Sequence, residues 1–140
     1  MEVGSLAKRK VQSEKRKVTM QNSKLQLKER TYIYALKIIK FIDSLPKEQS
    51  CKIIGAQLLR SATSIGANII EAQASSTKKD FTNFFSYALK SANESKFWSG
   101  PLRDSKKTNK EETNELLDED IELSNILGSS ILTLKGKRKF

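Results

Sequence analysis

Apolar residues recur every three or four positions over most of the chain, and this spacing predicts helices rather than strands. The pattern breaks at residues 44–46, 74–77 and 104–109, where helix-breaking and small polar residues accumulate. Short connections make consecutive helices antiparallel neighbours, so we expect an all-α, up-down-up-down antiparallel four-helix bundle over residues 23–134. The expected helices cover residues 23–44, 48–74, 78–103 and 109–134.

The last expected helix shows the clearest periodicity. Its apolar positions follow a 7-4-4-3 spacing: Leu116, Leu123, Leu127, Ile131 and Leu134. Thr108 and Glu111 fit a capping box, in which each side chain bonds to a free amide at the helix start. In the preceding helix, Pro101 removes a backbone donor, so we expect that helix to kink or end near residues 99–101.

The second helix divides into an apolar arc and a polar stripe when it is placed on a helical wheel. The expected core arc contains Leu58, Leu59, Ile65, Ile69 and Ile70, with Gly55, Ala62 and Gly66 small enough for another helix to approach. The polar stripe consists of Gln57, Arg60, Ser64, Asn68 and Glu71. Because it mixes amides and a hydroxyl with one charge of each sign, we interpret it as a buried, hydrogen-bonded network within or between chains. An ordinary solvated face is the alternative.

The third helix carries more aromatic surface than one core face requires. We expect the core face to be Phe81, Phe84, Phe85, Ala88 and Ala92. An aromatic flank, formed by Tyr87, Phe97 and Trp98, lies beside Lys90 and Glu94. We favour burial of this flank against another subunit. Packing against the N-terminal arm or a terminal helix, or stacking on unpaired bases, are the alternatives.

The charge is concentrated at the two ends of the chain. Of a formal net charge of +10, residues 1–24 contribute seven basic and two acidic side chains, and the last six residues contribute four basic and no acidic ones. We therefore expect a flexible basic arm at 1–22 and a basic tail at 135–140 that bind phosphate backbones in a salt-dependent way. A role in solubility alone, or a true start at Met20, would also explain the arm. The candidate nucleic-acid ligands are Arg60, Lys78, Lys79, Lys90, Lys8, Arg9, Lys10, Lys15, Arg16, Lys17, Lys135, Lys137, Arg138 and Lys139.

Several classes of chemistry are disfavoured by the composition. The chain has no histidine, which removes the imidazole general base and most zinc or di-iron ligand sets. Cys51 is the single cysteine, which excludes a disulfide within the chain and a cysteine metal cluster. The acidic run at 111–122 lacks the glycine that a calcium loop needs. We expect a non-enzymatic protein without metal or cofactor. No apolar run approaches the length of a membrane span, and a cytoplasmic location is expected.

Residues 57–72, QLLRSATSIGANIIEA, and 84–94, FFSYALKSANE, resemble those of the four-helix-bundle proteins encoded in 23S ribosomal RNA intervening sequences. The family pattern Arg-Ser-x-x-Ser-Ile-x-x-Asn-Ile-x-Glu corresponds to residues 60–71, and the resemblance extends over about 30–134. It implies a bacterial bundle that assembles into a ring, pentameric in known relatives, and that binds nucleic acid, with RNA favoured. Related accessory proteins of diversity-generating retroelements bind RNA together with a reverse transcriptase, so a scaffold for a protein partner is a second expectation. The resemblance supplies no catalytic residue.

Two positions depart from the family pattern. Ala72 stands where the family more often has glycine. Pro101 stands where an apolar residue normally continues the helix.

Overall fold

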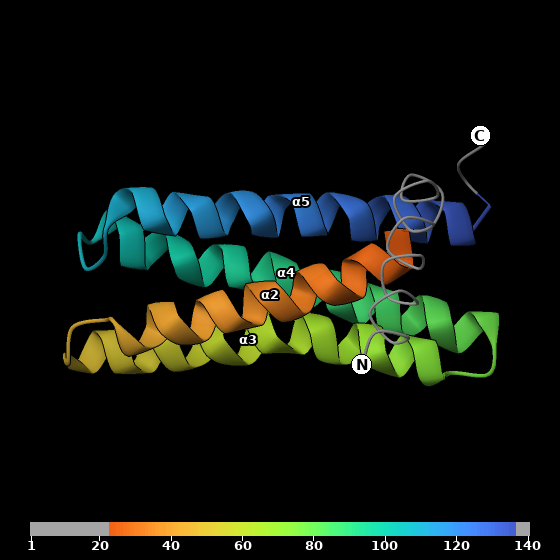
Figure 1. The fold of residues 1–140 in the computed structure, drawn as a ribbon, viewed down its shortest axis with the longest axis horizontal. Coiled ribbons are helices and arrows are strands. Elements are labelled where there is room, and N and C mark those ends of the chain that lie inside the picture. Colours follow the sequence, from red (N-terminus) through yellow and green to blue (C-terminus); the bar gives the residue numbers. More distant parts are fainter. Residues whose placement is uncertain (1–22, 137–140) are drawn as a thin grey trace, which may run out of the picture.

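In the part of the chain that the structure describes, four antiparallel helices run along the long axis (Figure 1). The computed structural model describes residues 23–136, with side chains from Leu27 onward, and holds no strand in that range. The helices are α2 (Ser23–Asp43), α3 (Gln49–Ala74), α4 (Lys78–Asp104) and α5 (Lys110–Leu134). The all-α fold is confirmed, and each expected helix agrees within one residue at both ends. The basic arm expected at 1–22 and the part of the basic tail beyond Gly136 lie outside the described residues.

The core is built from one apolar stripe of each helix. In α2 the stripe is Leu27, Tyr34, Ile38 and Phe41, which are all at most 2% exposed. The expected stripe of α5 is confirmed, because Leu116, Leu123, Leu127 and Ile131 are buried and Leu134 packs against them. Among the four main seams, the most extensive joins α3 to α4, and the least extensive joins α2 to α5. Within the described residues, no helix is both long and apolar enough to cross a membrane.

The expected cap at the start of the last helix is wrong. The N-cap of α5 is Asn109, whose side chain accepts a hydrogen bond from the Glu112 amide at 3.1 Å, so the expected capping box at Thr108 and Glu111 does not form. Thr108 instead bonds through its hydroxyl to the Thr113 hydroxyl at 2.6 Å. Asn accepts at least as well as Thr at an N-cap, which allows the helix to begin one residue later.

Pro101 does not end α4, which continues to Asp104. The proline is exposed and lies in the last two turns, on the solvent side of the helix. Water can therefore satisfy the carbonyl that loses its backbone donor, and few later bonds depend on it. The loop to α5 stays short, at residues 105–109.

The core arc of α3 is narrower than expected. Ile70 is 47% exposed and Leu59 only partly buried, and on α4 Phe81 and Phe84 are also only partly buried. These residues lie at the edges of their apolar arcs, where the neighbouring helix covers only one side of each side chain. The expected close approach at Gly66 is confirmed, since a Cβ there would lie 3.2 Å from the Thr31 hydroxyl of α2.

Gly128, inside α5, offers room for a side chain, because a Cβ there would meet no atom within 4 Å. Gly128→Ala is expected to raise the free energy of unfolding by about 0.5–1 kcal/mol, since glycine loses more backbone entropy than alanine when a helix forms. Chemical denaturation measures the change. Gly66→Ala is the matched control, and its gain should be smaller because Thr31 must move. Equal gains at the two sites would contradict this account.

Candidate functional site

One end of the bundle collects the starts of α2 and α4 and the ends of α3 and α5 (right-hand side of Figure 1). Lys78 and Lys79 open α4 at this end, Lys135 follows α5, and all three are exposed. The chain enters the bundle at Ser23 and leaves it after Lys135 at the same end, so the topology brings together the points where both basic segments attach. We call this set of lysines the basic end. The other terminal candidates lie outside the described residues: Lys8, Arg9, Lys10, Lys15, Arg16, Lys17, Lys137, Arg138 and Lys139.

The lysines of the basic end form no ion pair with any acidic residue in the described range. At the opposite end of the bundle, by contrast, Lys107 bonds to the Glu48 carboxylate at 2.5 Å and Arg103 pairs with Asp104 at 2.9 Å. A lysine that has no carboxylate partner remains available to contact a phosphate group. Lys90 is exposed as well, but it lies in the middle of α4, away from the basic end.

The polar stripe of α3 makes its hydrogen bonds mainly within the chain. The Arg60 guanidinium donates to the Gln57 side-chain oxygen at 2.9 and 3.1 Å and pairs with the Glu94 carboxylate of α4. Ser64 donates to the Arg60 carbonyl at 2.7 Å, and Asn68 donates to the Ser64 carbonyl at 2.9 Å. None of the five stripe residues is buried in this chain, so the expectation of a network buried within one copy is wrong. The hydrogen bonds of the stripe need no second chain, so they give no support of their own to a network between chains.

The aromatic flank meets the polar stripe at Glu94. Trp98 donates its indole N–H to Glu94 Oε2 at 2.8 Å, the same oxygen that Arg60 contacts. The Trp98 bond and Arg60 lower the pKa of Glu94 more than burial raises it, which keeps this carboxylate ionised. The flank is not uniform, because Trp98 is partly buried against the core while Phe97 is 62% exposed. Tyr87 is 47% exposed and contacts Phe84 edge-on.

The seam between α2 and α5 holds a buried carboxyl group that the sequence analysis did not single out. Asp120 is fully buried, its Oδ2 accepts a hydrogen bond from the Tyr34 hydroxyl at 3.2 Å, and its Oδ1 has no partner. Burial raises the pKa of Asp120 to about 7, against the smaller opposing effects of the Tyr34 bond and of Lys96. On the outer side of the same seam, Arg30 pairs with Glu119 and Glu122, both at 2.6 Å. A signal was present, because Asp120 occupies an apolar position between Leu116 and Leu123.

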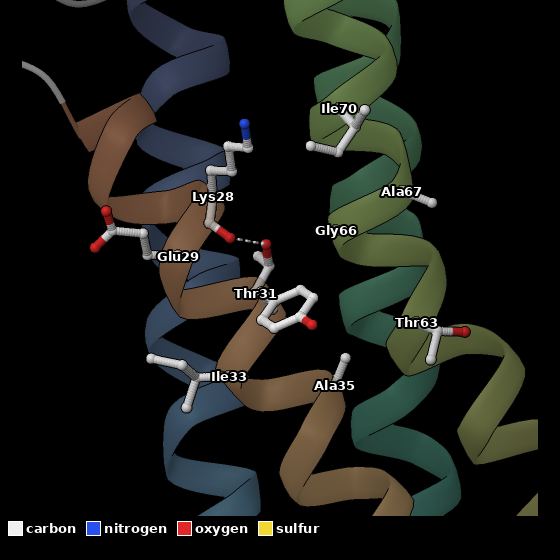
Figure 2. A pocket seen from close by; sticks show the side chains of 10 residues that line it. Lys28, Glu29, Thr31, Ile33, Ala35, Thr63, Gly66, Ala67 and Ile70 are labelled. Atoms are coloured by element: carbon white, nitrogen blue, oxygen red, sulfur yellow. Dashed lines mark hydrogen bonds between the residues drawn. The ribbon is translucent and has the colours of Figure 1, made fainter. Parts of the chain in front are cut away.

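A groove of about 590 Å³ lies between α2 and α3 (Figure 2). Its lining includes the small residues Ala35, Thr63, Gly66 and Ala67, and Lys28 of α2 lies across it from Ile70 of α3. The outer face of α2 beside it is apolar, with Tyr32, Ile33, Leu36 and Ile39 between 42% and 68% exposed. The sequence analysis did not single out this face. The apolar run at residues 32–39, which fills more than one side of a helix, was the available signal.

The comparisons with known proteins agree with this architecture. The family model described as "23S rRNA-intervening sequence protein" matches residues 23–129. A crystal structure of a protein of unknown function from the S23 ribosomal protein family of Bacteroides thetaiotaomicron is 32% identical, with a TM-score of 0.73. The alignment covers 77% of this chain and 96% of the other. No curated protein matches the chain.

In the described part of the chain, no cluster of three or more His, Cys, Asp or Glu side chains is placed to hold a metal ion.

Proposed function

The chain belongs to the 23S rRNA-intervening sequence protein family, and from this premise we propose that it is a cytoplasmic, non-enzymatic, homo-oligomeric bundle that binds nucleic acid through phosphate contacts. Structured RNA is the favoured ligand, and a ring, pentameric as in known relatives, is the favoured assembly. The observation that carries the binding proposal is the basic end: unpaired Lys78, Lys79 and Lys135 lie at the same end of the bundle as the points where both basic segments attach. Such a surface contacts backbones without reading sequence.

Local structure at the start of α4 supports this role. The Thr77 side chain caps only the Asp80 amide at 3.1 Å, so other amides of the first turn still point out of the helix end. Free amides and two adjacent lysines together favour an anion at this position. Arg60 is a weaker candidate than the sequence suggested, because Glu94 already neutralises it.

Filter binding of a structured RNA at low and raised salt tests the proposal. The triple variant Lys78→Gln, Lys79→Gln, Lys135→Gln is expected to bind about tenfold more weakly and to reduce the salt slope, since each phosphate contact contributes about 0.7–0.9 to it. The control variant Lys47→Gln, Lys52→Gln, Lys110→Gln removes the same charge from exposed positions nearer the opposite end and should lose far less affinity. Absence of binding at low salt, or equal losses in the two variants, would overturn the proposal.

A scaffold that holds a protein partner is the second candidate, as the resemblance to retroelement accessory proteins suggests. The observation that favours it is the exposed apolar face of α2, which contains Tyr32, Ile33, Leu36 and Ile39. A helix on the surface of a monomeric protein does not need such a face. A partner that stays bound in a pull-down after nuclease treatment and a high-salt wash would support this candidate. Loss of every partner under nuclease would count against it.

A further inference from the structure

One side of α4 carries a row of polar and aromatic side chains that includes no carboxylate. The row starts at Lys79 of the basic end and recurs every three or four positions, which keeps it on a single side of the helix. Its members are Lys79, Asn83, Ser86, Lys90, Asn93 and Phe97, and all except the partly buried Ser86 are exposed. We call this set the α4 row. The adjacent helix α5 differs, since its exposed positions include Glu115, Asp118 and Glu122.

The α4 row carries a net positive charge. Within the described residues, neither Lys79 nor Lys90 forms an ion pair. Two carboxylates border the row on the same helix, Asp80 in the first turn and Glu94 farther along. Arg60 of α3 pairs with Glu94 and neutralises it. The two lysines therefore outweigh the one remaining acidic neighbour, which favours a polyanion at this surface.

Phe97 ends the row with a flat aromatic surface. The residue is 62% exposed, and its ring contacts Trp98 at an interplanar angle of 73°, with the centroids 5.0 Å apart. This edge contact orients a ring that still meets solvent. Tyr87 is 47% exposed and lies at the edge of the row, between the two lysines in the sequence. Exposed rings interspersed with lysines are the arrangement on which single-stranded nucleic acids stack their bases.

We propose that the α4 row binds an unpaired segment of RNA, with phosphates on Lys79 and Lys90 and a base stacked on Phe97. The inference rests on the nucleic-acid binding proposed above and names unpaired nucleotides as the part of the ligand that this helix takes. Lys79 and Phe97 are about five helical turns apart, or about 27 Å, which is long enough for several nucleotides. Asn83 and Asn93 add amides that donate to and accept from the edges of unpaired bases.

A protein partner fits this surface less well. The core of a protein–protein interface is apolar and depleted of charged residues. In the α4 row, by contrast, Phe97 is the one large apolar side chain, and Lys90 and Asn93 precede it. Duplex RNA also fits less well, because its bases stack on one another and leave no face for the ring. An unpaired segment offers phosphates and open base faces together.

Filter binding at low salt tests the inference, with oligouridylate as the unpaired probe and a blunt duplex RNA of equal length for comparison. Phe97→Leu keeps an apolar side chain but loses the flat ring, so it should bind oligouridylate about tenfold more weakly, on the scale of one base–aromatic stack. Phe97→Tyr keeps the ring and is the matched control, which should bind like the wild type. Both variants should bind the duplex like the wild type. Because Phe97 is exposed, light scattering should give both the wild-type mass.

Two further readouts follow the same complex. Lys90→Gln should reduce the salt slope for oligouridylate by about 0.7, the contribution of one phosphate contact on a single strand. Trp98 is the single tryptophan of the chain, and its emission should change when a base stacks on the neighbouring Phe97 ring.

The outcomes separate this inference from the proposed function. If Phe97→Leu binds oligouridylate as tightly as the wild type, or loses as much affinity for the duplex, the inference is wrong while nucleic-acid binding stands. A reduced mass of Phe97→Leu would also overturn it, because another copy of the chain would then cover the ring. If neither RNA binds the wild type at low salt, the proposed function fails, and the inference fails with it.

Discussion

Asp120→Asn is expected to become progressively more stable than the wild type as the pH rises from about 4 to about 7. In the folded chain burial raises the pKa of Asp120 from 3.8 to about 7, so the folded state holds a proton that the unfolded state has released over this range. Stability then falls with rising pH. A difference of about three pKa units corresponds to about 4 kcal/mol, reached above pH 7 and absent below pH 4. Denaturation of both proteins at several pH values measures it.

The groups around Asp120 explain why it is not neutralised by a partner. Tyr34 of α2 donates one hydrogen bond to Oδ2, Lys96 of α4 lowers the pKa only weakly, and Glu119 of α5 raises it. Arg30, the one guanidinium at this seam within the described residues, is already bound by Glu119 and Glu122. An ionised Asp120 is therefore buried with one oxygen unpartnered, which is costly, whereas an asparagine at this position stays neutral.

Asp118→Asn is the matched control for this prediction. Asp118 lies two residues earlier in α5 and is exposed, so its replacement should change stability by at most about 0.5 kcal/mol at every pH. Curves for the wild type and Asp120→Asn that run parallel from pH 4 to pH 8 would contradict the buried-proton account.

The four helices could be predicted closely because their signals are local. Apolar spacing in α5 and the breaks near Pro46, Ser75 and Ser105 depend only on neighbouring residues, and each expected end was correct to within one residue. Pro101 shows the limit of such reasoning. Its helix-breaking effect comes from the missing N–H and from the clash with the preceding turn, and the sequence does not reveal that α4 accommodates it and ends only at Asp104.

Contacts between helices could not be predicted because they depend on register. The polar stripe was correctly placed on one side of α3. Its partner Glu94, however, follows only from the way α3 and α4 align. The same alignment brings the Ser95 hydroxyl to within 2.9 Å of the Ser61 hydroxyl. Asp120 was hidden for the same reason. An acidic run such as 115–122 suggests a solvated face, and only the position of α2 shows that one of its members is buried.

Phe85→Ala is expected to lower the free energy of unfolding by about 3–5 kcal/mol, which is the usual cost of removing a buried phenylalanine. Phe85 is fully buried, and its ring stacks on Phe81 with centroids 4.6 Å apart. Phe97→Ala, on the same helix, is the matched control. Its ring is 62% exposed and contacts Trp98 edge-on, so the loss should be about 0.5 kcal/mol. Urea denaturation at two protein concentrations compares them. A large loss at Phe97 that grows with protein concentration would contradict this expectation, because it would mean that another copy covers this ring.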